Sequence, residues 1–356
     1  MSNKQSPTAT PGGSAGATKD LWSILKDEGT AVRSTDAFES QAGSETSIVV
    51  LGAKSSGKST IINRFLDKRE TPNPTVGLDY TYGRRTRAAT NAKDVAHIWE
   101  LGSGSLMTRL LEVPISTGSV HTTSVIICVD LSQPADVVST IEHFTSALGT
   151  RVEELLTGLE KRGSKRPKGL RTHAMKKYGA DHPDKAVVKP IPMAWAIVGT
   201  KYDVFRDLPG DVRRVLTRYL RYMAHIHGAA FLMSSDRADE ASSTRGKQLV
   251  SHFAFKTALP KTSDLTDPNK PMFDAPGADN LSDIYAGSTC KSLADIKSHM
   301  LMVLGKAGLL PNATAPGDNR SSSPSGFGVQ PLQHKALSAK FAEPLIDREC
   351  SAFIQV

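Results

Sequence analysis

The sequence of 356 residues has only three cysteines, Cys128, Cys290 and Cys350, which lie far apart and form no C-x-x-C pair. This scarcity argues against a disulfide framework and a cysteine-based zinc site, and it is typical of a reducing compartment. Long hydrophobic runs are also missing. No apolar run approaches the roughly 18 residues of a membrane span, which argues against an integral membrane protein. Residues 1–19 lack the apolar stretch of a signal peptide.

Acidic residues are missing from one stretch, residues 161–177, and this stretch accounts for the net charge. The chain carries 44 Lys+Arg against 36 Asp+Glu, a formal charge of +8. The stretch holds eight basic residues, so the rest of the chain is neutral: Lys161, Arg162, Lys165, Arg166, Lys168, Arg171, Lys176 and Lys177. Base-stacking aromatics are absent there except for the adjacent Tyr178. The pattern therefore predicts a solvated, flexible loop or a contact site for an acidic partner protein, rather than a nucleic-acid or membrane-surface binder.

Apolar segments of strand length alternate with helical patterns from residue 46 onward. Strands are predicted at 47–51, 79–87, 95–101, 124–131, 193–200 and 229–234. Helices are predicted at 20–26, 59–66, 207–227, 247–255 and 292–304. Continuous apolar runs are typical of strands that are covered on both faces. The alternation predicts an α/β fold with a mostly parallel sheet and helices on both faces.

The turn after the first strand carries a phosphate-binding motif. Residues 52–59, GAKSSGKS, fit G-x-x-x-x-G-K-[ST] at every defined position and lie between an apolar strand and a helix. The glycines let successive backbone N–H groups point at a phosphate, and the helix directs its N-terminus at the same anion. Lys58 adds a positive charge, and Ser59 can ligate Mg²⁺.

Two further segments indicate a guanine nucleotide. Thr200-Lys201-Tyr202-Asp203 ends an apolar strand and resembles the guanine motif N/T-K-x-D of small GTPases. Residues 71–80 resemble a first switch, in which Thr75 would ligate Mg²⁺ together with Ser59. The predicted nucleotide-binding residues are Gly52, Ser55, Ser56, Gly57, Lys58, Ser59, Thr60, Lys201 and Asp203. Whether the pocket holds GDP, GTP with Mg²⁺, or nothing stays open at this point.

The segment that should support hydrolysis departs from the GTPase pattern. Residues 98–104, IWELGSG, resemble the second switch W-D-T-A-G-Q, but Glu100 replaces the Asp, Ser103 the invariant Gly, and Gly104 the catalytic Gln. Hydrolysis needs a side chain that orients the attacking water, and glycine has none. The base-supporting S-A-K loop is altered as well, to residues 234–236, SSD. The sequence therefore predicts a phosphate cradle without a catalytic switch, in a protein that is not an enzyme.

Several segments resemble the light intermediate chains of cytoplasmic dynein 2, the ciliary retrograde motor. They cover residues 21 to 285 and include LWSILK, the phosphate loop, PTVGLDYTYGRR, KDVAHIWELG, VGTKYDVF and DPNKP. The resemblance implies a Ras-like fold used as a structural subunit. It implies binding to the dynein 2 heavy chain and other dynein 2 subunits, with intraflagellar transport trains and microtubules reached through the complex. ATP hydrolysis would belong to the heavy chain. The implied location is the cytoplasm, the cytoskeleton, and the axoneme and basal body of the cilium or flagellum.

The domain prediction has four parts. Residues 1–19 are predicted to be disordered, and 20–45 form a helix and linker. Residues 46–258 form the Ras-like P-loop domain, with a basic insertion at about 150–190. Residues 259–356 form a partly disordered extension.

A second hypothesis stays open beside the dynein subunit, namely an active or regulatory GTPase-like switch that binds GTP or GDP. An activating protein could supply an arginine finger in trans, which contributes a factor of about 10³–10⁵.

Overall fold

The computed structural model describes residues 44–310, apart from positions 69, 73, 89–90, 103, 236–239 and 264–269. The predicted disordered segment 1–19, the predicted helix 20–26 and the tail from 311 onward lie outside the described residues. None of the described helices is long and apolar enough to cross a membrane.

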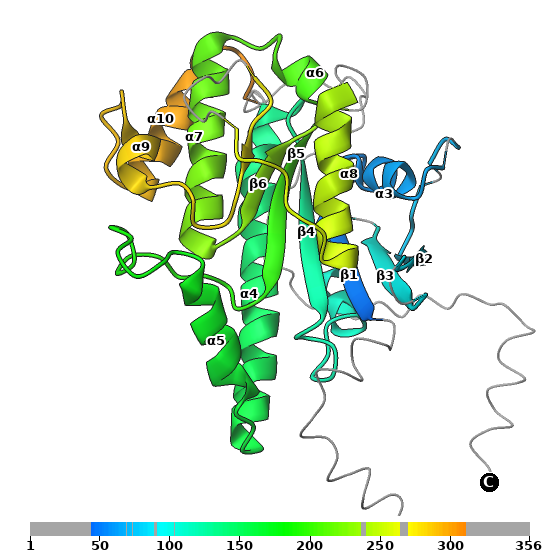
Figure 1. Cartoon of the computed structure of the whole chain (residues 1–356). Coiled ribbons are helices and arrows are strands. Elements are labelled where there is room, and N and C mark those ends of the chain that lie inside the picture. Colours follow the sequence, from blue (N-terminus) through cyan, green and yellow to red (C-terminus); the bar gives the residue numbers. More distant parts are fainter. Residues whose placement is uncertain are drawn as a thin grey trace, which may run out of the picture. The chain divides into compact units, whose positions relative to one another are not determined.

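One mixed sheet forms the centre of the domain (Figure 1). Its seven strands are ordered β2-β3-β1-β4-β5-β6-β7. The strands are β1 (Glu45–Gly52), β2 (Leu78–Thr86), β3 (Lys93–Leu101), β4 (Thr123–Asp130), β5 (Ala194–Thr200), β6 (Ala230–Met233) and β7 (Phe273–Asp274). From β3 to β6 all neighbours pair in parallel, whereas β2 and β7 pair antiparallel at the two edges. The predicted α/β fold with a mostly parallel sheet is confirmed.

Helices cover both faces of this sheet because its central strands are apolar on both sides. On β1, Val49 and Leu51 join the core under α4 and α7, while Ile48 and Val50 join the core under α3 and α8. This alternation follows from the two-residue period of a strand. The helices are α3 (Lys58–Phe65), η1 (Gly104–Glu112), η2 (Pro134–Asp136), α4 (Val137–Lys161), α5 (Arg166–Lys176), α6 (Tyr202–Phe205), α7 (Gly210–His227), α8 (Glu240–Phe255), α9 (Leu281–Tyr285) and α10 (Leu293–Lys306).

The predicted strands 79–87 and 95–101 correspond to β2 and β3, which form an antiparallel hairpin and bring two of the resembling segments together. Tyr80 lies opposite Trp99 in the register, with ring centroids 4.8 Å apart. Arg85 of the GRR sequence donates to the Asp94 carboxylate at 3.1 Å and to the Phe255 carbonyl at 3.0 Å. Asp94 is fully buried, which opposes ionisation, but hydrogen bonds from Arg87, Ser44 and Arg85 together hold its pKa well below the usual range. The ion pair within the hairpin therefore orients Arg85, and the hydrogen bond from Arg85 to Phe255 fastens the hairpin to the end of α8.

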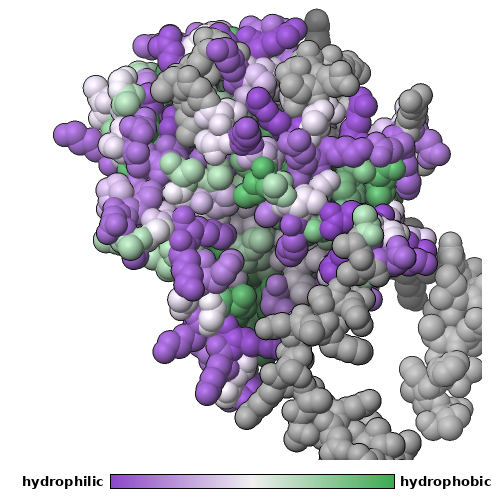
Figure 2. Space-filling model, viewed as in Figure 1, coloured by the Kyte–Doolittle hydropathy of each residue, from purple (hydrophilic) through white to green (hydrophobic). Residues whose placement is uncertain are grey.

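The basic stretch is not the flexible loop that the sequence predicts. Residues 161–177 run from the last residue of α4 into α5, which lies beside α4 (Figure 1). In the same view, hydrophilic residues gather at this end of the domain (Figure 2). Arg171 donates to Glu153 at 2.7 Å and also to Glu160, both on α4. Lys177 donates to the Gly228 carbonyl at 3.1 Å, and burial lowers its pKa to about 8. The prediction of a flexible loop did not take into account that acidic residues on α4 lie opposite the basic helix α5 and pair with it.

The described part of the predicted C-terminal extension packs on the domain. Strand β7 pairs with β6, so the sheet extends beyond the boundary predicted at residue 258. Helix α10 buries Ile296, Met300 and Leu304 in the core that also contains α7. The helix predicted at 292–304 therefore packs on the domain.

We expect the buried carboxyl group of β7 to make stability depend on pH. Asp274 is 2% exposed, and burial, with a contribution from the charge of Asp279, raises its pKa from 3.8 to about 7. Since the folded state then holds the proton more tightly, stability falls as pH rises from about 4 to 7. Asp274→Asn should raise the free energy of unfolding at pH 8 by about 1–3 kcal/mol and leave it nearly unchanged at pH 4.

Urea unfolding at the two pH values checks this. The control is Asp181→Asn, because Asp181 is exposed to solvent. An equal change for Asp274→Asn at both pH values would contradict the account.

Candidate nucleotide-binding site

The phosphate loop leaves β1 at Gly52, where the backbone passes close to the neighbouring strand. A Cβ at this position would lie 2.3 Å from the carbonyl oxygen of Cys128 on β4, and its φ is +148°, which favours glycine. Ser55 has a φ of +60° at the exposed tip of the loop, and the buried Ser56 donates its N–H to the Ala53 carbonyl at 3.3 Å. Gly57, with φ +82°, is the N-cap of α3. The glycine positions of the motif thus have the strained geometry that the motif requires.

Lys58 lies underneath this loop. Its side chain is folded back so that Nζ donates to the carbonyl oxygens of Gly52 at 3.3 Å and Ala53 at 2.8 Å. The residue is 5% exposed, and burial lowers its pKa, opposed by the nearby Cys128 and Glu100. A cation held at the base of the loop offers an anion a preorganised positive charge.

The residues predicted on the metal side lie at the start of α3 and around the end of β3. Ser59 and Thr60 are half-buried in the first turn of α3, and the Ser59 hydroxyl donates to the Glu100 carboxylate at 2.7 Å. Thr75 belongs to the segment before β2, which is held to the end of β3 by the Gly102 N–H donating to the Gly77 carbonyl at 2.6 Å. A hydroxyl with a buried carboxylate behind it is the oxygen-rich environment that Mg²⁺ prefers.

The predicted base-binding residues meet the phosphate loop at the end of β5. The Thr200 hydroxyl donates to the Ser56 carbonyl at 2.9 Å, which connects the strand end to the loop. Lys201 forms an ion pair with Asp130 at the end of β4. Asp203 accepts a hydrogen bond from the Ser235 hydroxyl at 2.7 Å. The carboxyl ends of β1, β4, β5 and β6 therefore converge at one edge, the place where open α/β sheets bind ligands.

Gly104 lies directly against the phosphate loop. A Cβ built on it would be 3.6 Å from the backbone nitrogen of Lys54, and its φ is +59°. The position is therefore close enough for a side chain to reach the loop, but glycine provides no group that could hold water. Ser103 and Asp236, the other altered switch and loop positions, lie outside the described residues.

Two structural contacts of the site were missed by sequence reasoning. No sequence motif predicts the hydrogen bond from the Thr200 hydroxyl to the Ser56 carbonyl, because this contact depends on how closely β5 approaches the loop. Asp130 could have been found as an acidic residue at the end of an apolar strand, next to the switch point of the sheet. A separate cluster of His182, Asp184 and His225 on the far end of α7 was also missed, because its members are distant in the sequence.

Comparisons with known proteins agree with one another. The family model for dynein light intermediate chains matches residues 16–185. Cytoplasmic dynein 2 light intermediate chain 1 of Bos taurus is 36% identical over 268 residues, covering 74% of this chain and 75% of the relative. The Homo sapiens protein of the same name is 35% identical over 266 residues, with coverages of 74% and 75%.

A solved structure shows the same fold. The crystal structure of the conserved domain of a dynein light intermediate chain aligns with a TM-score of 0.53 at 14% identity, covering 76% of this chain and 99% of that chain. At this identity the likeness concerns the fold alone.

We expect the contact between Gly102 and the segment before β2 to require glycine. A Cβ on residue 102 would lie 2.3 Å from the Thr75 carbonyl oxygen, so Gly102→Ala must displace that backbone. The substitution should lower the free energy of unfolding by about 1–3 kcal/mol and increase amide exchange in residues 74–78. Hydrogen exchange with mass spectrometry measures the second effect.

A matched control is Gly149→Ala inside α4, where nothing lies within 4 Å of an added Cβ. It should stabilise the helix by up to about 1 kcal/mol. Unchanged exchange in residues 74–78 of the Gly102→Ala variant would contradict the proposed contact.

Proposed function

Because the chain belongs to the dynein light intermediate chain family, we propose that it is a non-catalytic subunit of a cytoplasmic dynein 2 complex. Within the family it belongs to the group of the cytoplasmic dynein 2 light intermediate chains. In this role it binds and stabilises the dynein 2 heavy chain. The observation that carries the proposal is the similarity to these relatives over about three quarters of both chains, 74% and 75% for the Bos taurus protein.

The proposed setting follows from the same relatives. The subunit would work with the heavy chain and other dynein 2 subunits in retrograde intraflagellar transport and cilium assembly. It would reach microtubules and transport trains through the complex, in the cytoplasm, the axoneme and the basal body. Its formal charge does not require a nucleic-acid partner, because the basic excess lies on α5 and the end of α4, and part of it is paired with acids on α4.

The geometry of the second switch supports a non-catalytic domain. Gly104, which corresponds in sequence to the water-orienting Gln of small GTPases, lies beside the phosphate loop. Without that group the chain itself supplies no means of directing water at a γ-phosphate. Motor ATP hydrolysis would be the task of the heavy chain.

The residues at the edge of the sheet fit a guanine nucleotide as a structural ligand. Lys58 and the loop backbone would bind the phosphates, and Asp203, positioned by Ser235, would accept from the base. Ser59 and Thr75 would hold Mg²⁺ if it accompanies the nucleotide. A bound nucleotide would supply the negative charge that the buried Lys58 otherwise lacks, apart from its partial compensation by Glu100. Its role would be to complete the fold at this edge.

A second candidate function is a regulatory GTP/GDP switch. The hydrogen bond between Asp203 and Ser235 and the buried position of Lys58 support it, because a working pocket would use both residues. An activating protein would then have to supply the missing catalytic groups in trans.

The subunit role predicts a stable association. The chain, tagged and expressed in ciliated cells that lack their own copy, should co-purify with the dynein 2 heavy chain and restore retrograde traffic from the ciliary tip. Lys58→Ala should keep most of this association if the nucleotide is only a structural ligand. Normal ciliary traffic in cells without the chain, or purification free of a dynein heavy chain, would contradict the role.

The ligand role predicts that nucleotide is retained through purification. Denaturing the purified chain and separating the supernatant by chromatography should yield about one equivalent of guanine nucleotide. Asp203→Ala should lose it, whereas Asp207→Ala, which changes an exposed carboxylate in the same region, should keep it. GDP would indicate a fixed structural ligand and GTP a pocket that cannot hydrolyse it. Absence of nucleotide from the unaltered chain would refute the ligand part of the proposal and leave the subunit role standing.

A further inference from the structure

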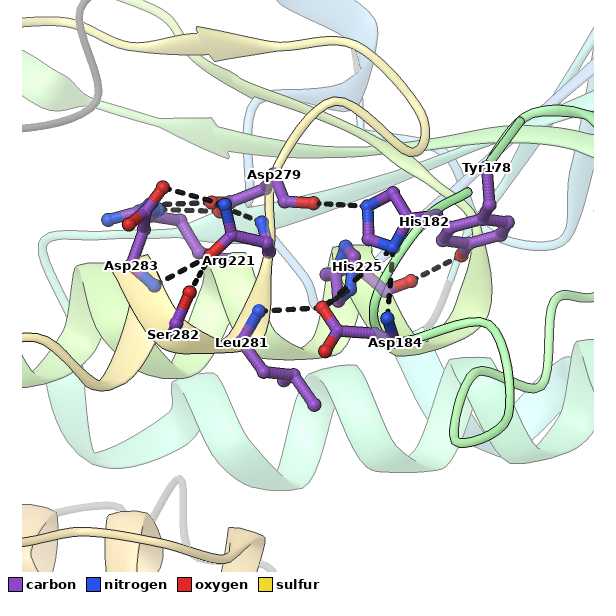
Figure 3. A network of polar contacts seen from close by, with 10 residues as sticks. Tyr178, His182, Asp184, Arg221, His225, Asp279, Leu281, Ser282 and Asp283 are labelled. Carbon is purple, nitrogen blue, oxygen red and sulfur yellow. Dashed lines mark hydrogen bonds and ion pairs between the residues drawn. The ribbon is translucent and has the colours of Figure 1, made fainter. Parts of the chain in front are cut away.

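A histidine and carboxylate cluster lies far from the phosphate loop, between the segment after α5 and the last turn of α7 (Figure 3). His182 and Asp184 come from the segment that joins α5 to β5, and His225 comes from α7. One nitrogen or oxygen of each residue lies within 4.8 Å of the others. Nothing in the nucleotide pocket or in the proposed subunit role explains this cluster.

The orientation of His182 can be assigned from its partners. Its Nε2 lies 3.0 Å from the carbonyl oxygen of Asp279, and a carbonyl can only accept, so Nε2 carries the proton. Nδ1 is therefore the acceptor, and the N–H of Asp184 donates to it at 3.2 Å. The Nδ1 lone pair accepts this hydrogen bond in the metal-free cluster, so an ion bound to Nδ1 would take the place of the Asp184 N–H. A histidine whose other nitrogen donates to a backbone carbonyl is the arrangement found in metal-binding histidines.

The carboxylate of Asp184 stands between the two rings. Its Oδ2 lies 2.9 Å from Nε2 of His225 and 4.0 Å from Nδ1 of His182. The same oxygen accepts from the N–H of Leu281 at 2.7 Å. Because ligating carboxylates are themselves held by hydrogen bonds, this contact is the kind of support that a metal ligand receives.

The surrounding residues fix the cluster from outside. Arg221 donates to both carboxylate oxygens of Asp279, at 2.8 and 2.7 Å, and so holds the carbonyl that orients His182. The Tyr178 hydroxyl donates to the His225 carbonyl. The side chain of His225 is fully buried, whereas those of His182 and Asp184 are 12% and 13% exposed. An ion could therefore enter from the His182 side, where a water could complete its coordination.

The donor types and spacing match a transition metal. Two imidazoles and one carboxylate form a nitrogen-rich set that suits Zn²⁺ and related ions rather than Ca²⁺ or Mg²⁺. Tetrahedral coordination with bonds of 2.0–2.1 Å separates ligand atoms by about 3.3 Å. The separations of Asp184 Oδ2 from the two imidazole nitrogens, 2.9 and 4.0 Å, lie on either side of this value, and all three ligand atoms lie within 4.8 Å of one another, so the side chains would have to close around the ion.

We propose that His182, Asp184 and His225 form a site for a divalent transition-metal ion of the zinc type. The ion would join the segment after α5 to α7. Through the hydrogen bonds of Asp279 and Leu281 it would also hold the chain that follows β7. The site is structural, with three protein ligands and one water. On binding, the Nε2 proton of His225 moves to Nδ1, which has no hydrogen-bond partner among the described residues.

Cobalt is the probe for this site because tetrahedral Co²⁺ absorbs visible light. The full chain is stripped with a chelator, desalted and titrated with CoCl₂. We expect visible bands that saturate near one equivalent, without the strong near-ultraviolet band of cobalt–thiolate bonds, and displacement by ZnCl₂. Zinc should also raise the melting temperature of the stripped chain, because a ligand that binds only the folded state stabilises it.

His182→Gln is the test variant, since its side chain is partly exposed, and His173→Gln on the exposed face of α5 is the matched control. His182→Gln should bind Co²⁺ at least about tenfold more weakly and lose the zinc-dependent rise in melting temperature. His173→Gln should behave as the unaltered chain. Measuring the melting temperature in chelator separates this effect from a general loss of stability.

Two results would overturn the proposal. The first is an unaltered chain that shows neither cobalt bands nor a zinc-dependent melting temperature, and this result does not depend on any variant folding. The second is a folded His182→Gln protein that binds cobalt with unchanged affinity. In that case the cluster would be a hydrogen-bonded joint without metal.

Discussion

The rest of the structure depends on the close approach of β1 to β4 at Gly52. Only a residue without a Cβ can pass the carbonyl oxygen of Cys128 at this point, and the phosphate loop begins there. The contact sets the loop beside the ends of β4 and β5, so that the Thr200 hydroxyl can hold the Ser56 carbonyl. A glycine contact between two parallel strands therefore sets the position of the predicted phosphate-binding loop relative to the predicted base-binding residues at the end of β5.

In the proposed role, the domain would bind a nucleotide without the side chain that hydrolysis needs. Buried Lys58 and the pair of Asp203 and Ser235 are fixed by hydrogen bonds within the protein, which a structural ligand could use without any moving part. At the second switch, Gly104 reaches the loop but offers only backbone. A side chain is needed to position the attacking water, but it is not needed to hold the nucleotide. Loss of that side chain is therefore compatible with a stable pocket. In the proposed role as a scaffold subunit of a motor, the domain would need the stability and not the turnover.

Much of the fold could be predicted from the sequence, because buried parallel strands are continuous apolar runs and the phosphate loop has a fixed spacing. The hairpin of β2 and β3 and the helix end at Gly228, with φ +70°, were also predictable from local patterns. The prediction of a flexible loop for the basic stretch was wrong, because the helix that forms there is stabilised by acidic residues on another helix, such as Glu153. Strand β7 and the His225 cluster could not be found, since they depend on contacts between distant segments.

The central claim is that the domain keeps a nucleotide pocket without hydrolysing nucleotide. Its most direct test is a single-turnover assay with GTP labelled in the γ-phosphate, using the purified chain and the chain within its dynein complex. We expect no phosphate release above that of buffer from the purified chain, and release from the complex that Lys58→Ala leaves unchanged. Phosphate release that is abolished by Lys58→Ala would contradict the claim.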